Sequence, residues 1–352
     1  WHEHPNCIVE AVSDLRPDRR RHLQEVYRCP KAYPSLEELI KDPAVEAVGV
    51  FTGAPDHVRH AKACLAAGKH VVCAVPAGMT VEECEDLLEA VQRSGLIYML
   101  AETVWYHQSV ITARQWYREG KFGRIYYTEA EYLHPGFEEY FFEEDGTRNW
   151  RHGVPPMKYP THCTAQLIAV TGERLTSVVC TGWGDGSPLI AGNMYNNPFW
   201  NETAFFTTDQ GNTLRAAVWW KGPMAEVERA QWHGERTIFY NTTVNGHGPI
   251  VRRDPEEWKK LVGEGQRVKR FEKFEQPEHW KSEVLPPSLR RPSAHDCSHP
   301  FITHEFIDTL LTGRRPEIDI YEALALTVPG IVAHESALQG GRQLQVPVYR
   351  RR

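Results

Sequence analysis

The stretch "PDHVRHAKACLAAGKHVVCAVPAG" (55–78) decides the fold. Residues 55–69 have the composition of a helix, and Gly68 is placed to end it. The run "HVVCAVP" (70–76) is apolar and rich in valine, as expected of a buried strand. A helix followed at once by a buried strand is the repeating unit of a parallel sheet with crossover helices.

The same alternation extends through the first hundred residues. Ser35 and Thr80 are suited to cap helices, and Glu83, three residues after Thr80, completes a capping box. The predicted strands are 7–15, 45–53, 70–76 and 96–104, and the predicted helices are 16–27, 35–43, 55–69 and 80–95. This order predicts an α/β fold with a doubly wound parallel sheet.

The rest of the chain has a different pattern. Runs that alternate polar and apolar residues predict an open, mostly antiparallel sheet, which makes the second part an α+β domain. The expected elements are a helix at 112–123, strands at 124–134, 176–184, 201–220 with a turn at 210–212, and 234–244, irregular structure from 250 to 298, and closing helices at 300–313 and 320–341. We therefore expect two domains, 1–105 and 106–352, with the closing helices packing back on the first.

The composition excludes several classes of protein. The 352 residues carry a formal charge of -6, so no basic surface for nucleic acid is expected. No apolar run reaches the roughly 20 residues that a membrane helix needs. Eight cysteines are scattered without a CxxC pair, which favours buried thiols in a reducing compartment and a cytoplasmic location.

Ligands of doubly wound sheets bind at the carboxyl ends of the strands. Asp14 follows the first predicted strand, where a carboxylate would accept the ribose hydroxyls of adenosine and repel a 2′-phosphate; a turn or helix-cap role is the alternative. The glycine loop of a dinucleotide fold, and the strand before it, are absent from this chain. We expect them in about 25 to 35 residues upstream of Trp1.

The segment "MKYPTHC" (157–163) sets two polar rings just before an amphipathic helix. Pro160 stiffens the approach, and we expect Thr161 to cap the helix. His162 then lies in the first turn, where the helix dipole disfavours its protonation and a neutral imidazole can serve as general base. The alternative is a core histidine satisfied by hydrogen bonds.

The chain resembles the glucose–fructose oxidoreductase/inositol dehydrogenase family of two-domain sugar oxidoreductases. The resemblance rests on residues 55–78, on "REGKFGRI" (118–125) and on the tail "RRPEIDIYEALALTVPGIVAHESALQGGRQLQVP" (314–347). It implies a bound NAD, a C-terminal sheet that covers the cofactor, and a homodimer or homotetramer built through that sheet. The ligand it implies is a carbohydrate or glycoside.

One departure from the family pattern concerns the strand before Pro76. The family usually has Glu-Lys-Pro there, with the lysine assisting proton transfer, whereas this chain has Ala74-Val75-Pro76. In this respect it is similar to glycoside hydrolase family 109, although Ala74 replaces the glutamate usual in that family. Further similarity lies in "AETVWY" (101–106), "EAEYLH" (129–134), "KYPTH" (158–162) and "SHPFITHEF" (298–306).

The resemblance assigns roles residue by residue. The catalytic candidates are His162, Tyr159 and Tyr132. The cofactor-binding candidates are Asp14, Leu15, Thr52, Gly53, Pro55, His57, Val75, Pro76 and Glu102. The substrate-side candidates are Trp105, His134, Trp183, His299 and His304. We expect no metal, because a redox or elimination reaction on NAD needs none.

Three functions remain open from the sequence. The first is an NAD-dependent oxidoreductase that moves a hydride at a sugar ring carbon, with C3 expected. The second is an NAD-recycling glycosidase that works by oxidation, elimination, hydration and reduction. The third is a catalytically degenerate sugar-binding or assembly protein, suggested by the absent glycine loop.

Overall fold

The computed structural model describes residues 1–223, 225–242 and 248–351. The chain separates into two compact units. Trp1–Thr103, Trp280–Leu324 and Arg351 belong to the first, and Val104–His279 with Ala325–Arg350 to the second. Helix α10 (Ile320–Leu338) begins in the first unit and continues in the second.

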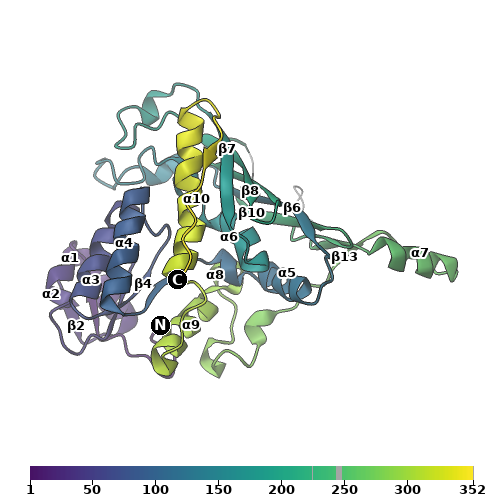
Figure 1. The fold of residues 1–352 in the computed structure, drawn as a ribbon. Coiled ribbons are helices and arrows are strands. Elements are labelled where there is room, and N and C mark those ends of the chain that lie inside the picture. The colour runs from purple at the N-terminus through teal and green to yellow at the C-terminus, as the bar shows by residue number, and fades with distance from the viewer. Residues whose placement is uncertain (224, 243–247, 352) are drawn as a thin grey trace. The chain divides into compact units, whose positions relative to one another are not determined.

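The first unit is an α/β arrangement with parallel strands (Figure 1). Strands β1 (Ala11–Ser13) and β2 (Lys31–Tyr33) form one sheet, and β3 (Ala47–Val50), β4 (His70–Cys73) and β5 (Tyr98–Leu100) form another. The helices are α1 (Pro17–Tyr27), α2 (Leu36–Leu39), α3 (His57–Ala66), α4 (Val81–Ser94), α8 (Ala294–Cys297) and α9 (His299–Thr312). The predicted fold class is confirmed, but as two parallel sheets, since no described strand pairs with both β1 and β3.

Two predicted helix caps are present in this unit. The Ser35 hydroxyl accepts a hydrogen bond from the Glu38 N–H, and Thr80 Oγ1 accepts one from the Glu83 N–H at 3.1 Å. The reciprocal bond of the capping box differs from the expected one. The Glu83 carboxylate accepts from the Met79 N–H at 2.8 Å, one residue before the cap.

The second unit is built on a nine-stranded sheet with the order β13-β12-β11-β10-β6-β9-β8-β7-β14. All neighbours are antiparallel except the central pair β6–β9. The strands are β6 (Ile125–Leu133), β7 (Leu175–Trp183), β8 (Asn201–Thr208), β9 (Thr213–Trp219), β10 (Val227–Gly234), β11 (Ile238–Tyr240), β12 (Ile250–Arg252), β13 (Phe271–Lys273) and β14 (Leu344–Gln345). Helices α5 (Gln108–Arg118), α6 (Thr161–Thr171) and α7 (Pro255–Gly263) complete the unit with most of α10.

The two faces of this sheet differ. Helix α6, buried along nearly its whole length, packs against β6, β9 and β10. Side chains alternate between faces along a strand. The register pairs Val179 with Phe205, Phe205 with Arg215, Arg215 with Glu129 and Glu129 with Gln231, so these five residues form one row across the other side of the sheet. We call this side the open face.

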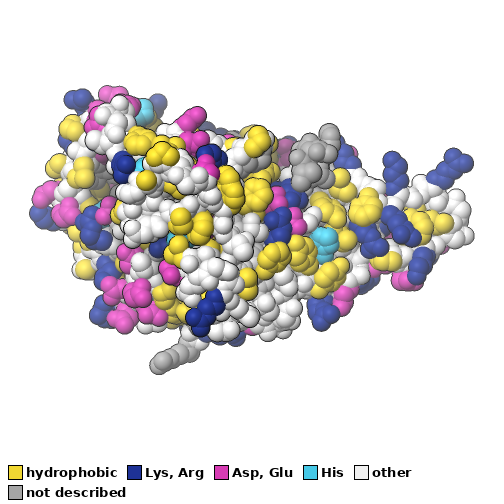
Figure 2. Space-filling model, turned by 90° about the horizontal axis from the view of Figure 1, so that it is seen from above, with side chains coloured by type: hydrophobic (Ala, Val, Ile, Leu, Met, Phe, Trp, Pro, Cys, Tyr) yellow, Lys and Arg dark blue, Asp and Glu magenta, His cyan; other side chains and the backbone are white. Residues whose placement is uncertain are grey.

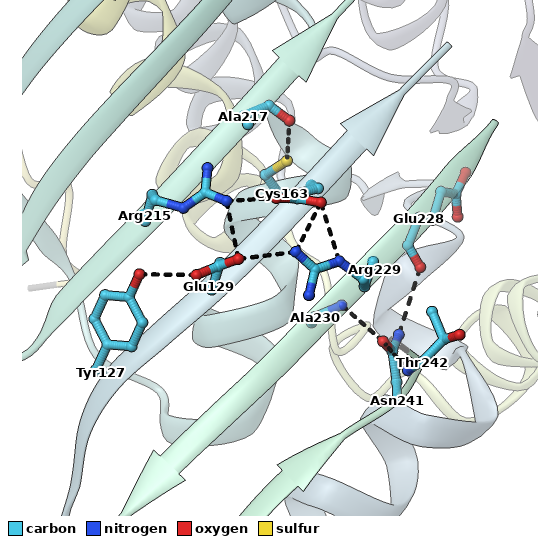
Figure 3. Close-up of polar contacts among 11 residues, drawn as sticks. Tyr127, Glu129, Cys163, Arg215, Ala217, Glu228, Arg229, Ala230, Asn241 and Thr242 are labelled. Carbon is cyan, nitrogen blue, oxygen red and sulfur yellow. Dashed lines mark hydrogen bonds and ion pairs between the residues drawn. The ribbon is translucent and has the colours of Figure 1, made fainter. Parts of the chain in front are cut away.

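A charged network lies at the centre of the open face (Figure 3). Arg229 and Arg215 each contact both Glu129 and Glu131, and Tyr127 donates to Glu129. Burial alone would raise the pKa of Glu129. The hydrogen bonds and charges of its arginine and tyrosine neighbours outweigh burial and lower this pKa to about 2. The network therefore stabilises the ionised carboxylate.

Two sequence-based expectations for this unit are wrong. Strand β10 was not predicted, because the adjacent charged residues Glu228 and Arg229 interrupt its alternation of polar and apolar residues. Residues 250–273, expected to be irregular, contain β12, α7 and β13, and Asp254 caps α7 by accepting from the N–H groups of Glu256 and Glu257. The segment 250–273 extends from the edge of the sheet (Figure 1) and is rich in Lys and Arg (Figure 2). Residues 243 and 244, the end of the strand predicted at 234–244, lie outside the described residues.

Candidate functional site

The carboxyl ends of β3 and β4 lie side by side in the first unit. The two strands are parallel hydrogen-bonded neighbours, so the segments after them, Thr52–Gly53 and Val75–Pro76, share one edge of the sheet. Val75 and Pro76 are buried, whereas Thr52 is exposed and bonds His60 through its hydroxyl at 2.8 Å. Gly53 precedes the short 3₁₀ helix η1 (Ala54–Asp56), which contains Pro55.

His57 joins these two strand ends. Its Nδ1 lies 2.8 Å from the Pro76 carbonyl oxygen and its Nε2 lies 3.0 Å from the Thr52 carbonyl oxygen. Burial lowers the pKa of His57 more than the two carbonyls raise it, so the ring is biased toward the neutral form, which donates to one carbonyl at a time. Because both ring nitrogens face backbone carbonyl oxygens, the role that this geometry gives His57 is to hold Thr52 and Pro76 in place.

The Asp14 carboxylate follows β1 as predicted. Its Oδ1 accepts a hydrogen bond from the Arg16 N–H at 2.8 Å, and Arg20 donates to the Asp14 carbonyl oxygen at 2.7 Å. The carboxylate therefore shapes the turn into α1, as the alternative interpretation held. That role uses one oxygen, and it is compatible with a ligand on the other. Leu15 is exposed, and Glu102, just after β5, is fully buried.

The three catalytic candidates come together in the second unit. Tyr132 lies on β6, Tyr159 ends the 3₁₀ helix η4 (Pro156–Lys158), and His162 is the second residue of α6. The Tyr132 ring centroid is 4.7 Å from that of His162 and 5.9 Å from that of Tyr159. The Tyr159 and His162 centroids are 5.4 Å apart. We call these three residues the ring cluster.

The start of α6 differs in one detail from the prediction. Pro160 is the N-cap residue, in a helical conformation, and Thr161 is already the first residue of the helix. The expectation that Thr161 caps the helix is therefore wrong, because Pro160 makes the turn by its own backbone. His162 remains in the first turn.

Trp220 supports the ring cluster and was not among the predicted site residues. Its ring meets Tyr132 edge-on at 5.8 Å and stacks on Phe137 at 4.2 Å. Its indole N–H donates to the Val154 carbonyl oxygen at 3.0 Å, which fixes the ring. The pair "WW" (219–220) at the end of a strand was the signal for it, but apolar pattern alone does not separate a packing ring from a site ring.

The substrate-side candidates are divided between the units. His134 lies beside the ring cluster, with its ring centroid 6.0 Å from that of Tyr132. Trp105 is buried and its backbone carbonyl accepts from Arg114, while Trp183 is exposed at the end of β7. His299 and His304 belong to the first unit, where His304 Nδ1 is 3.1 Å from His4 Nε2.

No group of three or more His, Cys, Asp or Glu side chains within the described part of the chain is arranged to hold a metal ion. The cysteines among these residues are all free thiols, and burial raises the pKa of Cys73 to about 12. None of the described helices combines the length and hydropathy needed to cross a bilayer.

Residues 1–102 match the model of an oxidoreductase family with an NAD-binding Rossmann fold. Along its whole length the chain is 22% identical to a glycosyl hydrolase family 109 protein of Streptomyces coelicolor, covering 79% of that protein. Over 127 residues it is 32% identical to trans-1,2-dihydrobenzene-1,2-diol dehydrogenase of Bos taurus, covering 36% of this chain and 37% of that one.

Solved structures share the fold of the whole chain. Levoglucosan dehydrogenase in complex with NADH superposes with a TM-score of 0.79 at 16% identity, over 97% of this chain and 91% of that one. An aldose-aldose oxidoreductase from Caulobacter crescentus, complexed with glycerol, superposes with a TM-score of 0.71 at 18% identity. The superposition covers 95% of this chain and 90% of that one. Residues 1–102 thus form an NAD-binding Rossmann domain of the glucose–fructose oxidoreductase/inositol dehydrogenase family, in a chain that has the fold of the solved oxidoreductases along its length.

Proposed function

We propose that this chain is an NAD(H)-dependent oxidoreductase that acts on a ring hydroxyl of a sugar or glycoside. The observation that carries the proposal is the ring cluster, which sets two tyrosines and a histidine in mutual contact at the start of α6. It occurs in a chain whose N-terminal domain matches an NAD-binding family. A solved relative in fold is a levoglucosan dehydrogenase bound to NADH and levoglucosan, which suggests the substrate class.

The residues at the strand ends fit a dinucleotide. Asp14 has one carboxylate oxygen in the turn before α1, and the other is suited to accept from a ribose hydroxyl. Thr52 and Gly53 offer a small, exposed backbone segment beside the buried Val75–Pro76, held by His57. When bound, NAD supplies the acceptor or donor of a hydride.

In this proposal the ring cluster transfers the proton of the substrate hydroxyl. Valine at position 75 cannot donate, accept or titrate, so the lysine role of the family is not available there. A neutral His162 imidazole takes the proton of the substrate hydroxyl as the carbon is oxidised, and returns it on reduction. The phenol groups of Tyr159 and Tyr132, packed against that imidazole, orient the hydroxyl and share the proton.

Asp14 leads to a prediction about the choice of cofactor. We expect the full-length protein to bind NAD(H) more tightly than NADP(H), because the Asp14 carboxylate repels a 2′-phosphate. Asp14→Ser should weaken NAD binding roughly 10- to 100-fold, since a hydrogen bond to a charged group contributes about 1.5–3 kcal/mol. Titration with both cofactors measures this, with Asp18→Ser, a nearby exposed acid paired with Arg16, as the matched control. Tighter binding of NADP(H) by the unaltered protein would remove Asp14 from this role.

A glycosidase is the second candidate, favoured by the full-length similarity to a family 109 protein and by Val75. In that reaction the sugar is first oxidised at C3, which acidifies the C2 proton. The C2 proton is then removed, the C1 substituent leaves, water adds, and the carbonyl is reduced again. The nicotinamide is restored in each cycle, so no cofactor is consumed.

The products distinguish the two reactions. We expect the full-length protein, incubated with NAD and a panel of nitrophenyl hexosides and free sugars in heavy water, to oxidise at least one of them. NADH in proportion to oxidised sugar, with the glycoside intact, identifies the dehydrogenase. Released nitrophenol without net NADH, with deuterium at C2, identifies the glycosidase. If neither product forms across the panel, the proposal of an enzyme is wrong and a binding protein becomes the better interpretation.

The open face leads to a prediction about assembly. Val179, Phe205 and Trp183 lie on neighbouring strands of this face and are 37%, 51% and 52% exposed. Apolar side chains gathered in this way are usually covered by a partner. We expect a homodimer or homotetramer by light scattering at micromolar concentration, and Phe205→Lys should shift it toward monomer. A monomer for the unaltered protein would contradict this.

A further inference from the structure

Glu202 is a fully buried carboxylate on β8 with two partners from distant parts of the second unit. Its Oε2 accepts a hydrogen bond from the Met157 N–H at 2.7 Å, and its Oε1 accepts from His334 Nδ1 at 2.8 Å. Met157 lies in η4, two residues before Tyr159, and His334 lies on α10. A buried carboxylate is tolerated only when it is paired in this way. Glu202 thus ties α10 to the segment that leads into α6.

Helix α10 touches that segment at two further points. An added Cβ on Gly330 would lie closer than 3.0 Å to the Met157 carbonyl oxygen and to the Pro160 side chain, so only glycine allows this approach. Thr164 Oγ1, on α6, donates to the Leu326 carbonyl oxygen at 2.8 Å. Leu326, Gly330 and His334 are spaced four residues apart and share one face of the helix. We call these three residues the α10 contact face.

Glu202, Leu326 and Gly330 each contact residues 157–164, and His334 reaches this segment through Glu202. This segment contains Tyr159 and His162, two members of the ring cluster. Its backbone is held from the side of the sheet by Glu202 and from the side of α10 by Gly330 and Leu326. The position and orientation of the first turn of α6 therefore depend on these contacts.

We propose that Glu202 and His334 are positioning residues for the reaction, acting through residues 157–164 to place Tyr159 and His162. This proposal rests on the proposed function of the ring cluster. Because Oε1 of Glu202 accepts, His334 carries its proton on Nδ1 in this pair. Its Nε2 is buried without a hydrogen-bond partner among the described residues, so the polar contact that orients the ring is the bond to Glu202. The ring also meets Phe199 edge-on, with centroids 6.4 Å apart.

Glu202→Ala tests the proposal against a purely structural role. It should lower kcat about 10- to 100-fold, since displacement of a catalytic group by about 1 Å has an effect of that order. The Kd for NAD should stay within about 2-fold. The matched control is Glu173→Ala, which removes another buried carboxylate of the same unit. Glu173 accepts a hydrogen bond from Asn212 at 2.8 Å, just past the C-terminal end of α6 and thus away from residues 157–164. If kcat falls no further in Glu202→Ala than in Glu173→Ala, the proposal is wrong.

Glu202→Gln separates position from charge. The amide oxygen can accept from the Met157 N–H, and the amide NH₂ can donate to His334 Nδ1 once the imidazole proton moves to Nε2. Turnover should therefore return to within about 5-fold of the unaltered protein, with the same pH profile, although Tm stays lowered by the buried Nε2–H. A glutamine variant as inactive as the alanine variant would show that the carboxylate charge itself is needed, which contradicts a positioning role.

Gly330→Ala tests the same placement without removing a polar group. The new methyl should displace the Met157–Pro160 backbone and lower kcat about 10-fold or more. Gly263→Ala in α7 is its control, because no atom lies within 4 Å of the added Cβ and its φ is not in the left-handed region. Equal turnover in the two variants would overturn the role of the α10 contact face.

A substrate-free measurement keeps this proposal distinct from the proposed function. In protein labelled at its histidine rings, Glu202→Ala and Gly330→Ala should shift the NMR signals of His162, and Glu173→Ala should not. If the NMR signals of His162 do not shift in these two variants, the positioning role is wrong, whatever their activity. A shift in these variants together with full activity of His162→Ala would leave the positioning intact and refute the function proposed for His162.

Discussion

Replacing His162 by alanine is expected to lower turnover by about 10²-fold or more, the usual contribution of a positioned general base. The imidazole lies 4.7 Å and 5.4 Å, between ring centroids, from the two tyrosines with which it would share the proton. Its loss leaves phenols, which are poor bases near neutral pH. The measurement is kcat on whichever sugar or glycoside proves active, with NAD affinity expected to stay unchanged.

His279→Ala is the matched control for this variant. His279 belongs to the same unit and bonds Thr112, a residue outside the ring cluster, through Nε2 at 2.9 Å. Its removal should change turnover by no more than a few-fold. The pH profile adds a second criterion, since His162→Gln should abolish the acidic limb of kcat/KM. Turnover in His162→Ala equal to that of the control would show that His162 is a core histidine.

Replacing Arg229 by alanine is expected to destabilise the second unit by about 3 kcal/mol at pH 7. The Arg229 side chain is 7% exposed and bonds both Glu129 and Glu131, which are 15% and 11% exposed. Removing one partner of a buried pair leaves uncompensated charge, and such losses are about 3–5 kcal/mol. Because Arg215 remains in contact with both carboxylates, we expect a loss at the lower end of this range. Urea denaturation at fixed protein concentration measures the difference.

The loss in the free energy of unfolding caused by Arg229→Ala should become smaller as the pH falls. The folded pKa of Glu129, about 2, lies below its unfolded value of about 4.3, so its contribution is present above pH 4.3 and is lost as the pH falls toward 2. With one arginine gone the folded pKa rises, and protonation then relieves the repulsion between Glu129 and Glu131. The difference between the proteins should thus be smaller at pH 4.5 than at pH 7.

Arg59→Ala provides the control for a surface ion pair. Arg59 bonds Asp56 at 2.9 Å with both side chains about half exposed or more, and such pairs contribute about 0.2–1 kcal/mol. A loss for Arg229→Ala no larger than for Arg59→Ala would mean that solvent compensates the network on the open face. If the difference in free energy of unfolding between the unaltered protein and Arg229→Ala instead grows at low pH, this would contradict the ionised state assigned to Glu129.

The fold was predictable where local and long-range signals agree. The helix and strand at 55–76 and the cap at Thr80 appear as expected, because amphipathic period, glycine stop and capping residue all point to the same element. Strand β10 was missed because the charge of Arg229 is neutralised by glutamates of β6, about 100 residues earlier in the chain. No pattern within 227–234 can show that a charge there is buried.

The candidate site was predictable only in part for the same reason. The resemblance singled out Tyr132, Tyr159 and His162, and the structure brings their rings into contact. Glu202 and His334 were missed, although a glutamate within "NETAFF" is unusual in an apolar strand. Their pairing spans 132 positions, and the reason for Gly330 becomes visible only when Met157 lies against it. Such contacts depend on tertiary packing, which sequence spacing does not report.

The central position of β6 has a consequence for the order in which the second unit folds. Tyr132 pairs with Val218 on β9, 86 positions later, and with Glu228 on β10, 96 positions later. A strand held only by such non-local neighbours cannot form early, because loop closure must precede its hydrogen bonds. During synthesis β6 must wait for β9 and β10 to emerge. The ring that Tyr132 supplies to the ring cluster is therefore among the last parts of the site to be assembled, and mutations in β9 or β10 should slow the acquisition of activity more than the formation of helices.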